Sequence, residues 1–321
     1  MAEVLLEIQN LVKEFPVKGR KGQFVHAVSD ISLKLYKGET LALVGESGCG
    51  KSTLGRTMIR LLPRTSGKII FEGNDISNLS DREFGEYRRK MQMVFQDPYA
   101  SLNPRMTVRD IIAEPLTTYQ VCGSKEATTA KVLELMKSVG VPQDFANRYS
   151  HQFSGGQRQR IGIARAIALN PELIVCDEPV SALDVSVQSQ VLNLLKDIQK
   201  ETGVTYLFIS HDLSVVNFIA DRVCVMFLGK VCEVADKDSL YEKPLHPYTR
   251  FLLDAIPKAD PHLRSKEKKI LMGEIPSPVN PPRGCRFHTR CPYATDKCKF
   301  EEPVMRNIDD HDVACHYAGE V

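Results

Sequence analysis

A glycine-rich stretch that begins at residue 45 constrains this chain more than any other part of its sequence. Residues 41–44 form an apolar run, which predicts a strand buried on both faces. The run breaks into Gly-x-x-x-x-Gly-Lys-Ser at residues 45–52, and a segment that permits a helix follows. Glycines let successive backbone N–H groups point inward at a polyanion. The stretch therefore predicts a P-loop, and a glycine-rich turn with a Lys-Ser pair by chance is the less favoured alternative.

This P-loop predicts a site for phosphate groups and Mg²⁺. Lys51 is expected to reach the β- and γ-phosphates, and Ser52 is expected to coordinate Mg²⁺. The helix expected at about residues 52–61 presents the positive end of its dipole to the same charge. The residues of the predicted site are Gly45, Glu46, Ser47, Gly48, Cys49, Gly50, Lys51, Ser52 and Thr53.

Length and composition favour a globular chain of about two domains. It has 321 residues, of which 43% are hydrophobic, and its net charge is +2 from 42 basic and 40 acidic residues. No overall field therefore draws it to nucleic acid or to an anionic membrane. The N-terminus lacks the features of a signal peptide, and no run approaches the roughly 18 apolar residues of a membrane span. We expect a cytosolic protein that touches a membrane only through partners.

The N-terminal segment predicts antiparallel strands. Residues 4–12 and 24–35 alternate apolar and polar side chains, which favours two or three strands. Phe15 or Phe24 could stack on a flat base, and a place in the core is the alternative for either ring.

Polar side chains follow three further apolar runs. They are Gln96, the adjacent pair Asp177 and Glu178, and His211. Open α/β sheets place their ligand chemistry at the carboxyl ends of parallel strands, which favours a functional role for these groups. The alternatives are an ordinary polar loop for the carboxylates and a structural role for the histidine.

A helical insertion is expected over residues 107–150, and it leads into Ser154-Gly-Gly-Gln157. Ser154 and Gln157 alone would be a capping box. However, Gly155 and Gly156 each cost about 1 kcal/mol of helix propensity, which is a poor choice for a cap alone. We infer that these glycines allow another group to approach the backbone closely.

The C-terminal region changes character at residue 257, where prolines and a basic cluster at residues 264–269 indicate a linker or a surface tail. Four cysteines follow at gaps of five, six and sixteen residues: Cys285, Cys291, Cys298 and Cys315. They could be buried thiols, a zinc site or an iron–sulfur site. Structural zinc sites more often have closer cysteine pairs, so the wide gaps favour a [4Fe–4S] cluster, with Zn²⁺ as the alternative.

Taken in order, these motifs resemble the full set of an ABC-type ATPase. They correspond to Walker A, Q-loop, signature, Walker B, D-loop and H-loop, where Ser181 to Asp184 forms the D-loop. The resemblance covers residues 4 to about 255, and Phe153 stands where the family more often has Leu. It implies an α/β P-loop ATPase with a mainly parallel core sheet, an N-terminal antiparallel β subdomain, a helical subdomain and a cysteine-rich C-terminal extension.

The resemblance also implies a role for each motif. Two ATPase domains pair head to tail, so that Ser154, Gly155, Gly156 and Gln157 close over ATP in the partner's P-loop. Asp177 and Ser52 would hold Mg²⁺, with Gln96 sensing the metal, and Glu178 would act as the general base. His211 would contact the γ-phosphate, and Asp184 is a further implied nucleotide contact. Phe15 belongs to the predicted nucleotide contacts through the base stacking described above. Because each motif occurs once, the second half-site must come from another polypeptide.

The C-terminal stretches 244–257 and 273–282 resemble the extension of oligopeptide/dipeptide importer ATPases, and residues 101–106 resemble the F-type subunit. The implied partners are a D-type ATPase, two permeases and an extracytoplasmic binding protein, without nucleic acid. The implied location is the cytoplasmic face of the inner membrane. Family members with this cysteine pattern carry an iron–sulfur cluster. A soluble ABC ATPase acting on nucleic acid or ribosomes is the alternative.

We therefore predict an ATPase domain at residues 1–256, with its helical subdomain at about 97–165. A C-terminal extension with a four-cysteine metal site is predicted at residues 257–321.

Overall fold

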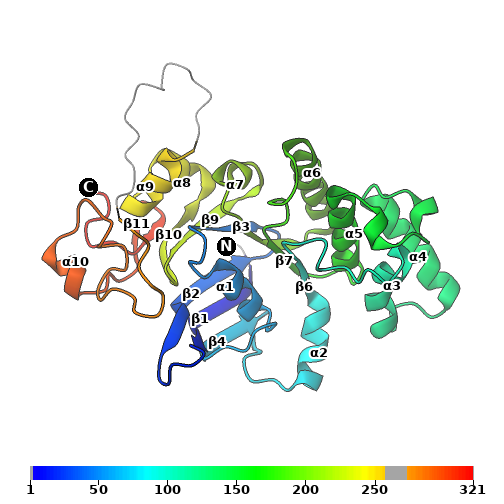
Figure 1. Ribbon diagram of the computed structural model, residues 1–321, viewed down its shortest axis with the longest axis horizontal. Helices are drawn as coiled ribbons and strands as arrows, with labels where there is room; N and C mark the ends of the chain where they lie inside the picture. Colours follow the sequence, from blue (N-terminus) through cyan, green and yellow to red (C-terminus); the bar gives the residue numbers. More distant parts are fainter. Residues whose placement is uncertain (1–2, 257–272, 321) are drawn as a thin grey trace, which may run out of the picture. The chain divides into compact units, whose positions relative to one another are not determined.

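The computed structural model describes residues 3–256 and 273–320 of the chain (Figure 1). These residues belong to two compact units. Of the described residues, the first unit contains residue 3 and residues 36–38 and 78–209, and the second contains residues 4–35, 39–77, 210–256 and 273–320. The predicted basic cluster at residues 264–269 lies outside the described residues. The domain boundaries predicted from the sequence stay a prediction.

The first unit is built on three parallel strands. They are β6 (Met91–Val94), β7 (Leu173–Asp177) and β8 (Thr205–Ile209), paired in the order β6-β7-β8. Every residue of β7 and β8 is buried, which explains why their sequences are continuous apolar runs and do not alternate. This arrangement confirms the predicted parallel core.

Helices make up the rest of the first unit. They are α2 (Asp81–Lys90), α3 (Val108–Thr118), α4 (Lys125–Ser138), α5 (Gly155–Ile167) and α6 (Val185–Thr202), with short 3₁₀ helices at Gln143–Phe145 and Ser150–Gln152. Helices α3, α4 and α5 lie together in Figure 1. The side chains of Ser80, Thr107 and Ser124 accept backbone hydrogen bonds at the starts of α2, α3 and α4, and serine and threonine are preferred at this position.

The second unit contains an antiparallel sheet, which confirms the prediction for the N-terminal segment. Its strands, in spatial order, are β2 (Phe24–Tyr36), β1 (Val4–Pro16), β4 (Ser66–Phe71) and β5 (Asn74–Asp75). Strand β1 pairs with β4 in antiparallel register from Leu6 opposite Phe71 to Gln9 opposite Lys68.

Further strands of the second unit connect the start of the P-loop to the C-terminal region. In spatial order they are β3 (Thr40–Val44), β9 (Arg222–Phe227), β10 (Lys230–Asp236), β12 (His311–Val313) and β11 (Arg306–Ile308). The β3–β9 pair is parallel, and the remaining pairs are antiparallel. The helices are α1 (Lys51–Met58), α7 (Leu213–Ile219), α8 (Lys237–Glu242), α9 (Pro247–Asp254) and α10 (Asp296–Phe300). The C-terminal residues thus extend the sheet that contains the P-loop strand.

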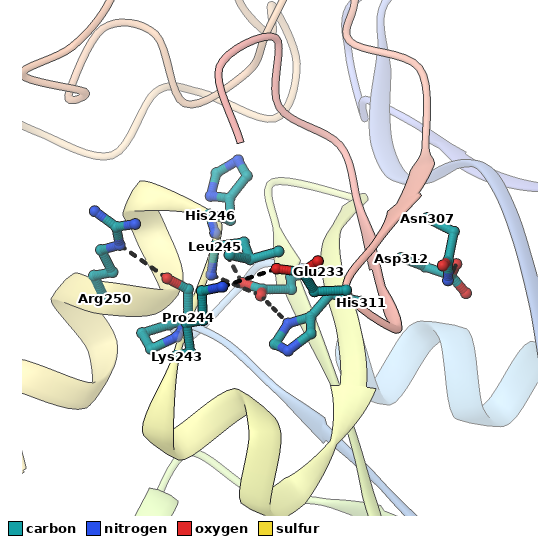
Figure 2. A network of polar contacts seen from close by, with 10 residues as sticks. Glu233, Lys243, Pro244, Leu245, His246, Arg250, Asn307, His311 and Asp312 are labelled. Carbon is teal, nitrogen blue, oxygen red and sulfur yellow. Dashed lines mark hydrogen bonds and ion pairs between the residues drawn. The ribbon is translucent and has the colours of Figure 1, made fainter. Parts of the chain in front are cut away.

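A buried carboxylate joins three segments of this unit, and Figure 2 shows its contacts. Glu233 on β10 accepts hydrogen bonds from the backbone N–H groups of Leu245 and His246, at 2.9 and 3.0 Å. Its other contact is with His311 Nδ1 on β12, at 2.7 Å. Because Glu233 is fully buried and paired, this network fixes both the start of α9 and the C-terminal hairpin.

Candidate functional site

The loop between β3 and α1 has the backbone of a phosphate-binding loop. Gly45, Gly48 and Gly50 adopt φ values of 146°, 78° and 106°. A Cβ atom at Gly45 would lie 2.1 Å from the carbonyl oxygen of Met226, and one at Gly50 would lie 2.0 Å from that of Ala27. Glycine is therefore required at both positions by conformation and by space.

Lys51 lies along this loop. Its ammonium group donates to the carbonyl oxygens of Gly45 at 2.7 Å and Glu46 at 3.1 Å, and the residue is 5% exposed. Ser52 and Thr53, in the first turn of α1, are half-buried. The first N–H groups of a helix have no intrahelical partner, so this end offers donors and a positive dipole to an anion. The loop has the donor set that phosphate groups require.

The structure places two further predicted residues in the second unit. His211 is exposed and directly precedes Asp212, which caps α7. Phe15 is half-buried, with the ammonium group of Lys13 at 4.6 Å from its ring centroid. The γ-phosphate contact of His211 and the base stacking of Phe15 stay predictions.

In the first unit, the Q-loop glutamine and the second Walker B carboxylate are in direct contact. Gln96 Nε2 donates to Glu178 Oε2 at 2.9 Å. Asp177 ends β7 and is fully buried, whereas Glu178 is half-buried and Gln96 is exposed. The arrangement therefore brings a hydrogen-bonded carboxylate to the exposed end of the parallel strands, beside a second, buried carboxylate.

The backbone at Glu178 is strained and firmly held. Its φ is +46°, in the left-handed region that disfavours side chains with a Cβ atom. Its N–H donates to Ile209 O at 3.0 Å, and its carbonyl oxygen accepts from both the N–H and the hydroxyl of Ser181. These bonds hold the backbone of Glu178 in its strained conformation, a pattern that is found at functional sites.

The signature residues begin α5. Ser154 and Gln157 form a complete capping box. The two glycines differ: a Cβ atom at Gly156 would lie 2.3 Å from a methyl group of Val187, whereas one at Gly155 would be in ordinary contact, 3.4 Å from Leu183. Packing within the chain therefore explains Gly156 and leaves Gly155 without such a reason.

Asp184 caps the next helix. Its carboxylate accepts hydrogen bonds from the Ser186 hydroxyl at 2.8 Å and from Val187 N at 3.1 Å, at the start of α6. The bond from Ser186 lowers the pKa of this carboxyl. The D-loop aspartate thus has a local structural role, and its nucleotide contact stays a prediction.

Sequence reasoning missed two residues that contact the P-loop. Tyr248 Oη accepts from Glu46 N–H at 2.9 Å, and Arg290 donates to the Glu46 carboxylate at 2.7 Å. No local pattern points to either contact, because both residues lie about 200 positions or more beyond the loop.

Comparisons with known proteins agree on one family. Residues 28–181 match the model described as ABC transporter, and residues 232–298 match the C-terminal region of oligopeptide/dipeptide transporters. The chain is 55% identical to the oligopeptide transport ATP-binding protein AppF of Bacillus subtilis, over 98% of this chain and 97% of that protein. It is 51% identical to OppF of Salmonella typhimurium, over 98% and 96% of the two chains.

A solved structure supports the same assignment. The dimeric ATP-binding cassette MJ0796, in a post-hydrolysis state bound to ADP and phosphate, matches with a TM-score of 0.66 and 31% identity. The match covers 73% of this chain and 99% of that one. Among residues 3–256 and 273–320, no helix has the length and apolar character needed to cross a membrane.

The iron–sulfur prediction is wrong. In the described part of the chain, no group of three or more His, Cys, Asp or Glu residues is placed to hold a metal ion. The four cysteines line a cavity of about 20 Å³, which has room for a single water molecule. Burial raises the pKa of Cys285 to about 12, and it also raises the pKa values of Cys291 and Cys315.

The matched descriptions are those of ATP-binding transport proteins. The same geometry gives no support to Zn²⁺, the alternative. Cys285 and Cys291 pack against the apolar core that contains Phe287.

Proposed function

The chain belongs to the ABC transporter family of ATPases, and from this membership we propose that it is the ATP-hydrolysing motor subunit of an oligopeptide importer. The observation that carries the proposal is a family match in the part of the chain that follows the ATPase motifs. Residues 232–298 match the C-terminal region of oligopeptide/dipeptide transporters, a region that the general ABC model does not include. ATPase motifs alone would fit any member of the wider family.

The P-loop is the proposed nucleotide site. Its glycine backbone, Lys51 and the start of α1 fit the phosphates of ATP, and Ser52 and Asp177 are the proposed ligands of Mg²⁺. Bound Mg·ATP would supply the phosphoryl group for transfer to water. Glu178 would take the proton of the attacking water, and the hydrogen bond from Gln96 would orient its carboxylate.

We propose that the working unit contains a second ATPase chain. Each ATPase motif occurs once in this sequence, and the related solved cassette is dimeric. The signature residues Ser154, Gly155, Gly156 and Gln157 would contact ATP in the partner's P-loop, where the start of α5 favours negative charge. A D-type subunit is the proposed partner.

The proposed assembly also contains two permeases and an extracytoplasmic binding protein. This chain would lie at the cytoplasmic face of the inner membrane, attached through the permeases. The similarity to oligopeptide transport proteins supports this arrangement and gives no support to a role on nucleic acid or ribosomes.

Peptide uptake by the assembled transporter tests the proposal. The complex would be placed in liposomes with the binding protein outside and ATP inside, and uptake of labelled oligopeptides would be measured. Lys51→Ala should abolish uptake, because the loop loses the cation that is proposed to bind the phosphates. Lys68→Ala, at an exposed position on β4, is the matched control and should transport normally. Purification with ribosomes or DNA and without permeases would refute the proposal.

A further inference from the structure

Glu46 is the acidic residue that follows the first glycine of the P-loop, and two residues of the C-terminal region hold it. Its backbone N–H donates to the Tyr248 hydroxyl at 2.9 Å. Its carboxylate accepts from Arg290 Nη1 at 2.7 Å, in an ion pair whose side chains are 22% and 7% exposed. Neither contact involves Lys51, so both can hold the loop when that ammonium group turns to a phosphate.

The first of these residues, Tyr248, is fixed by its surroundings. It is fully buried, and its ring packs at 4.9 Å from that of Phe227 and 5.2 Å from that of Phe287. Its backbone N–H donates to His246 Nδ1, and the backbone N–H of His246 is in turn held by the buried carboxylate of Glu233 (Figure 2). A chain of contacts therefore leads from β10 to the P-loop backbone.

Arg290 depends on Glu46 for its charge pairing. The guanidinium lies 5.9 Å from the Phe227 ring centroid. Its Nε is buried and has no hydrogen-bond partner among the described residues. A buried guanidinium needs polar partners, and the Glu46 carboxylate provides one at Nη1.

The ion pair between Arg290 and Glu46 matters for phosphate binding because the Glu46 carboxylate and the phosphates are both negatively charged. An unpaired carboxylate at the start of a phosphate-binding loop would repel a triphosphate, and the partly buried position would weaken solvent screening of that repulsion. Arg290 cancels this charge and, at the same time, restrains the side chain that carries it.

We propose that Arg290 and Tyr248 are positioning residues of the nucleotide site. Tyr248 fixes the loop backbone at Glu46, and Arg290 neutralises the Glu46 carboxylate so that ATP can bind. The inference rests on the proposed function in one respect, since it takes the P-loop to be the ATP site. It assigns to the C-terminal region a role in nucleotide affinity.

Binding of Mg·ATP to the full-length chain tests this inference. Arg290→Met should raise the Kd for Mg·ATP about tenfold, because it leaves a partly buried carboxylate unpaired beside the phosphates. Tyr248→Phe should raise it about threefold, because it removes one neutral hydrogen bond while keeping the ring. In the assembled transporter, Arg290→Met should raise KM for ATP and leave kcat nearly unchanged, since Glu178 and Gln96 are untouched.

The direction in which Glu46→Gln changes the affinity for Mg·ATP separates charge neutralisation from general support of the fold. Glu46→Gln leaves the Arg290 charge beside the loop, so it should bind Mg·ATP about twofold more tightly than wild type. Arg290→Met combined with Glu46→Gln should return to within about threefold of the wild-type Kd. Arg306→Met is the matched control, because the Arg306 guanidinium donates to the carbonyl oxygens of Cys315 and His316. The affinity of this variant for Mg·ATP should be unchanged.

Each outcome decides the question. Wild-type protein that fails to bind Mg·ATP would refute the proposed function itself. Wild-type binding with an unchanged Kd in Arg290→Met, or no recovery in the double variant, would overturn the inference alone. Weaker binding of Mg·ATP by Glu46→Gln would also overturn the inference. This variant keeps the inference testable even if Arg290→Met does not fold.

Discussion

At the scale of single residues, the candidate site combines backbone strain with firm anchoring. Glu178 keeps a positive φ although it has a side chain, at a cost of about 1 kcal/mol. The Gln96 contact and the backbone bonds to Ile209 and Ser181 hold it there. The sequence could predict the pair Asp177 and Glu178 from their place after an apolar run. It could not predict the strain, because φ depends on neighbouring strands.

The first prediction concerns the proposed general base. Glu178→Gln should lower ATP turnover by about 10² to 10⁴, because an amide cannot accept the proton of the attacking water. Its amide oxygen can still accept the hydrogen bond from Gln96, so the unfolding midpoint should stay close to that of wild type. ATP turnover by the assembled transporter and thermal unfolding of the chain measure the two effects.

Glu172→Gln is the control for this prediction. Glu172 lies just before the same strand and pairs with Lys90 at 2.8 Å, away from the proposed chemistry. It should keep turnover near the wild-type rate. Wild-type turnover by Glu178→Gln would show that another group activates the water.

At the scale of elements, patterns that repeat along the chain were predictable and contacts between distant segments were not. Capping residues such as Thr107 and Ser124 mark helix starts locally, so the sequence reveals them. The hairpin turn at Gly229 is also local. The C-terminal strands β11 and β12 have only three residues each, which is too short for a periodic signal, and β12 is held by its pairing with β10.

The start of α9 should make the fold sensitive to acid. Burial lowers the pKa of His246 from 6.5 to about 4, and the nearby Glu233 carboxylate only partly opposes this effect. Between pH 6.5 and about pH 4, His246 therefore binds a proton more readily in the unfolded chain than in the folded chain. The stabilisation is complete above about pH 6.5 and is lost progressively as the pH falls towards 4. Wild-type protein should lose on the order of 1–2 kcal/mol of unfolding free energy from this residue between about pH 7 and pH 5.

His246→Asn tests this origin of the acid sensitivity. The Asn oxygen can accept the Tyr248 N–H as a helix cap, and it does not titrate. Glu233 and His311 remain in both proteins, so their contributions cancel in the comparison. Denaturant unfolding at the two pH values should give a smaller loss in the variant, whereas equal losses would assign the effect to other groups.

At the scale of the whole molecule, the ATPase motifs were the predictable part because each is a short, local pattern. The P-loop glycines are an example: their positive φ values follow from a spacing that the sequence displays. The four cysteines show the limit of this reasoning. Their spacing suggested a metal site, but spacing cannot reveal how the surrounding chain packs, and the described C-terminal region places them around a very small cavity.

The last prediction concerns pairing with the proposed second ATPase chain. Gly155 has no packing reason within the chain, since a Cβ atom would lie 3.4 Å from the nearest side-chain atom. If the start of α5 meets ATP held by a partner, a negative charge there should repel the γ-phosphate. Gly155→Asp should therefore abolish ATP-driven pairing and transport-coupled hydrolysis, while Mg·ATP still binds to the chain's own P-loop with wild-type affinity.

Gly155→Asn separates charge from size in this test, because its side chain has nearly the same volume without the charge. Gly155→Asn should pair with the second ATPase chain better than Gly155→Asp does. Higher ionic strength should reduce this difference in pairing between the two variants. Light scattering of the two ATPase chains with ATP measures pairing, and nucleotide titration measures the P-loop. Normal pairing by Gly155→Asp would mean that the start of α5 does not face the phosphate, and the two-chain site would have to be built from other residues.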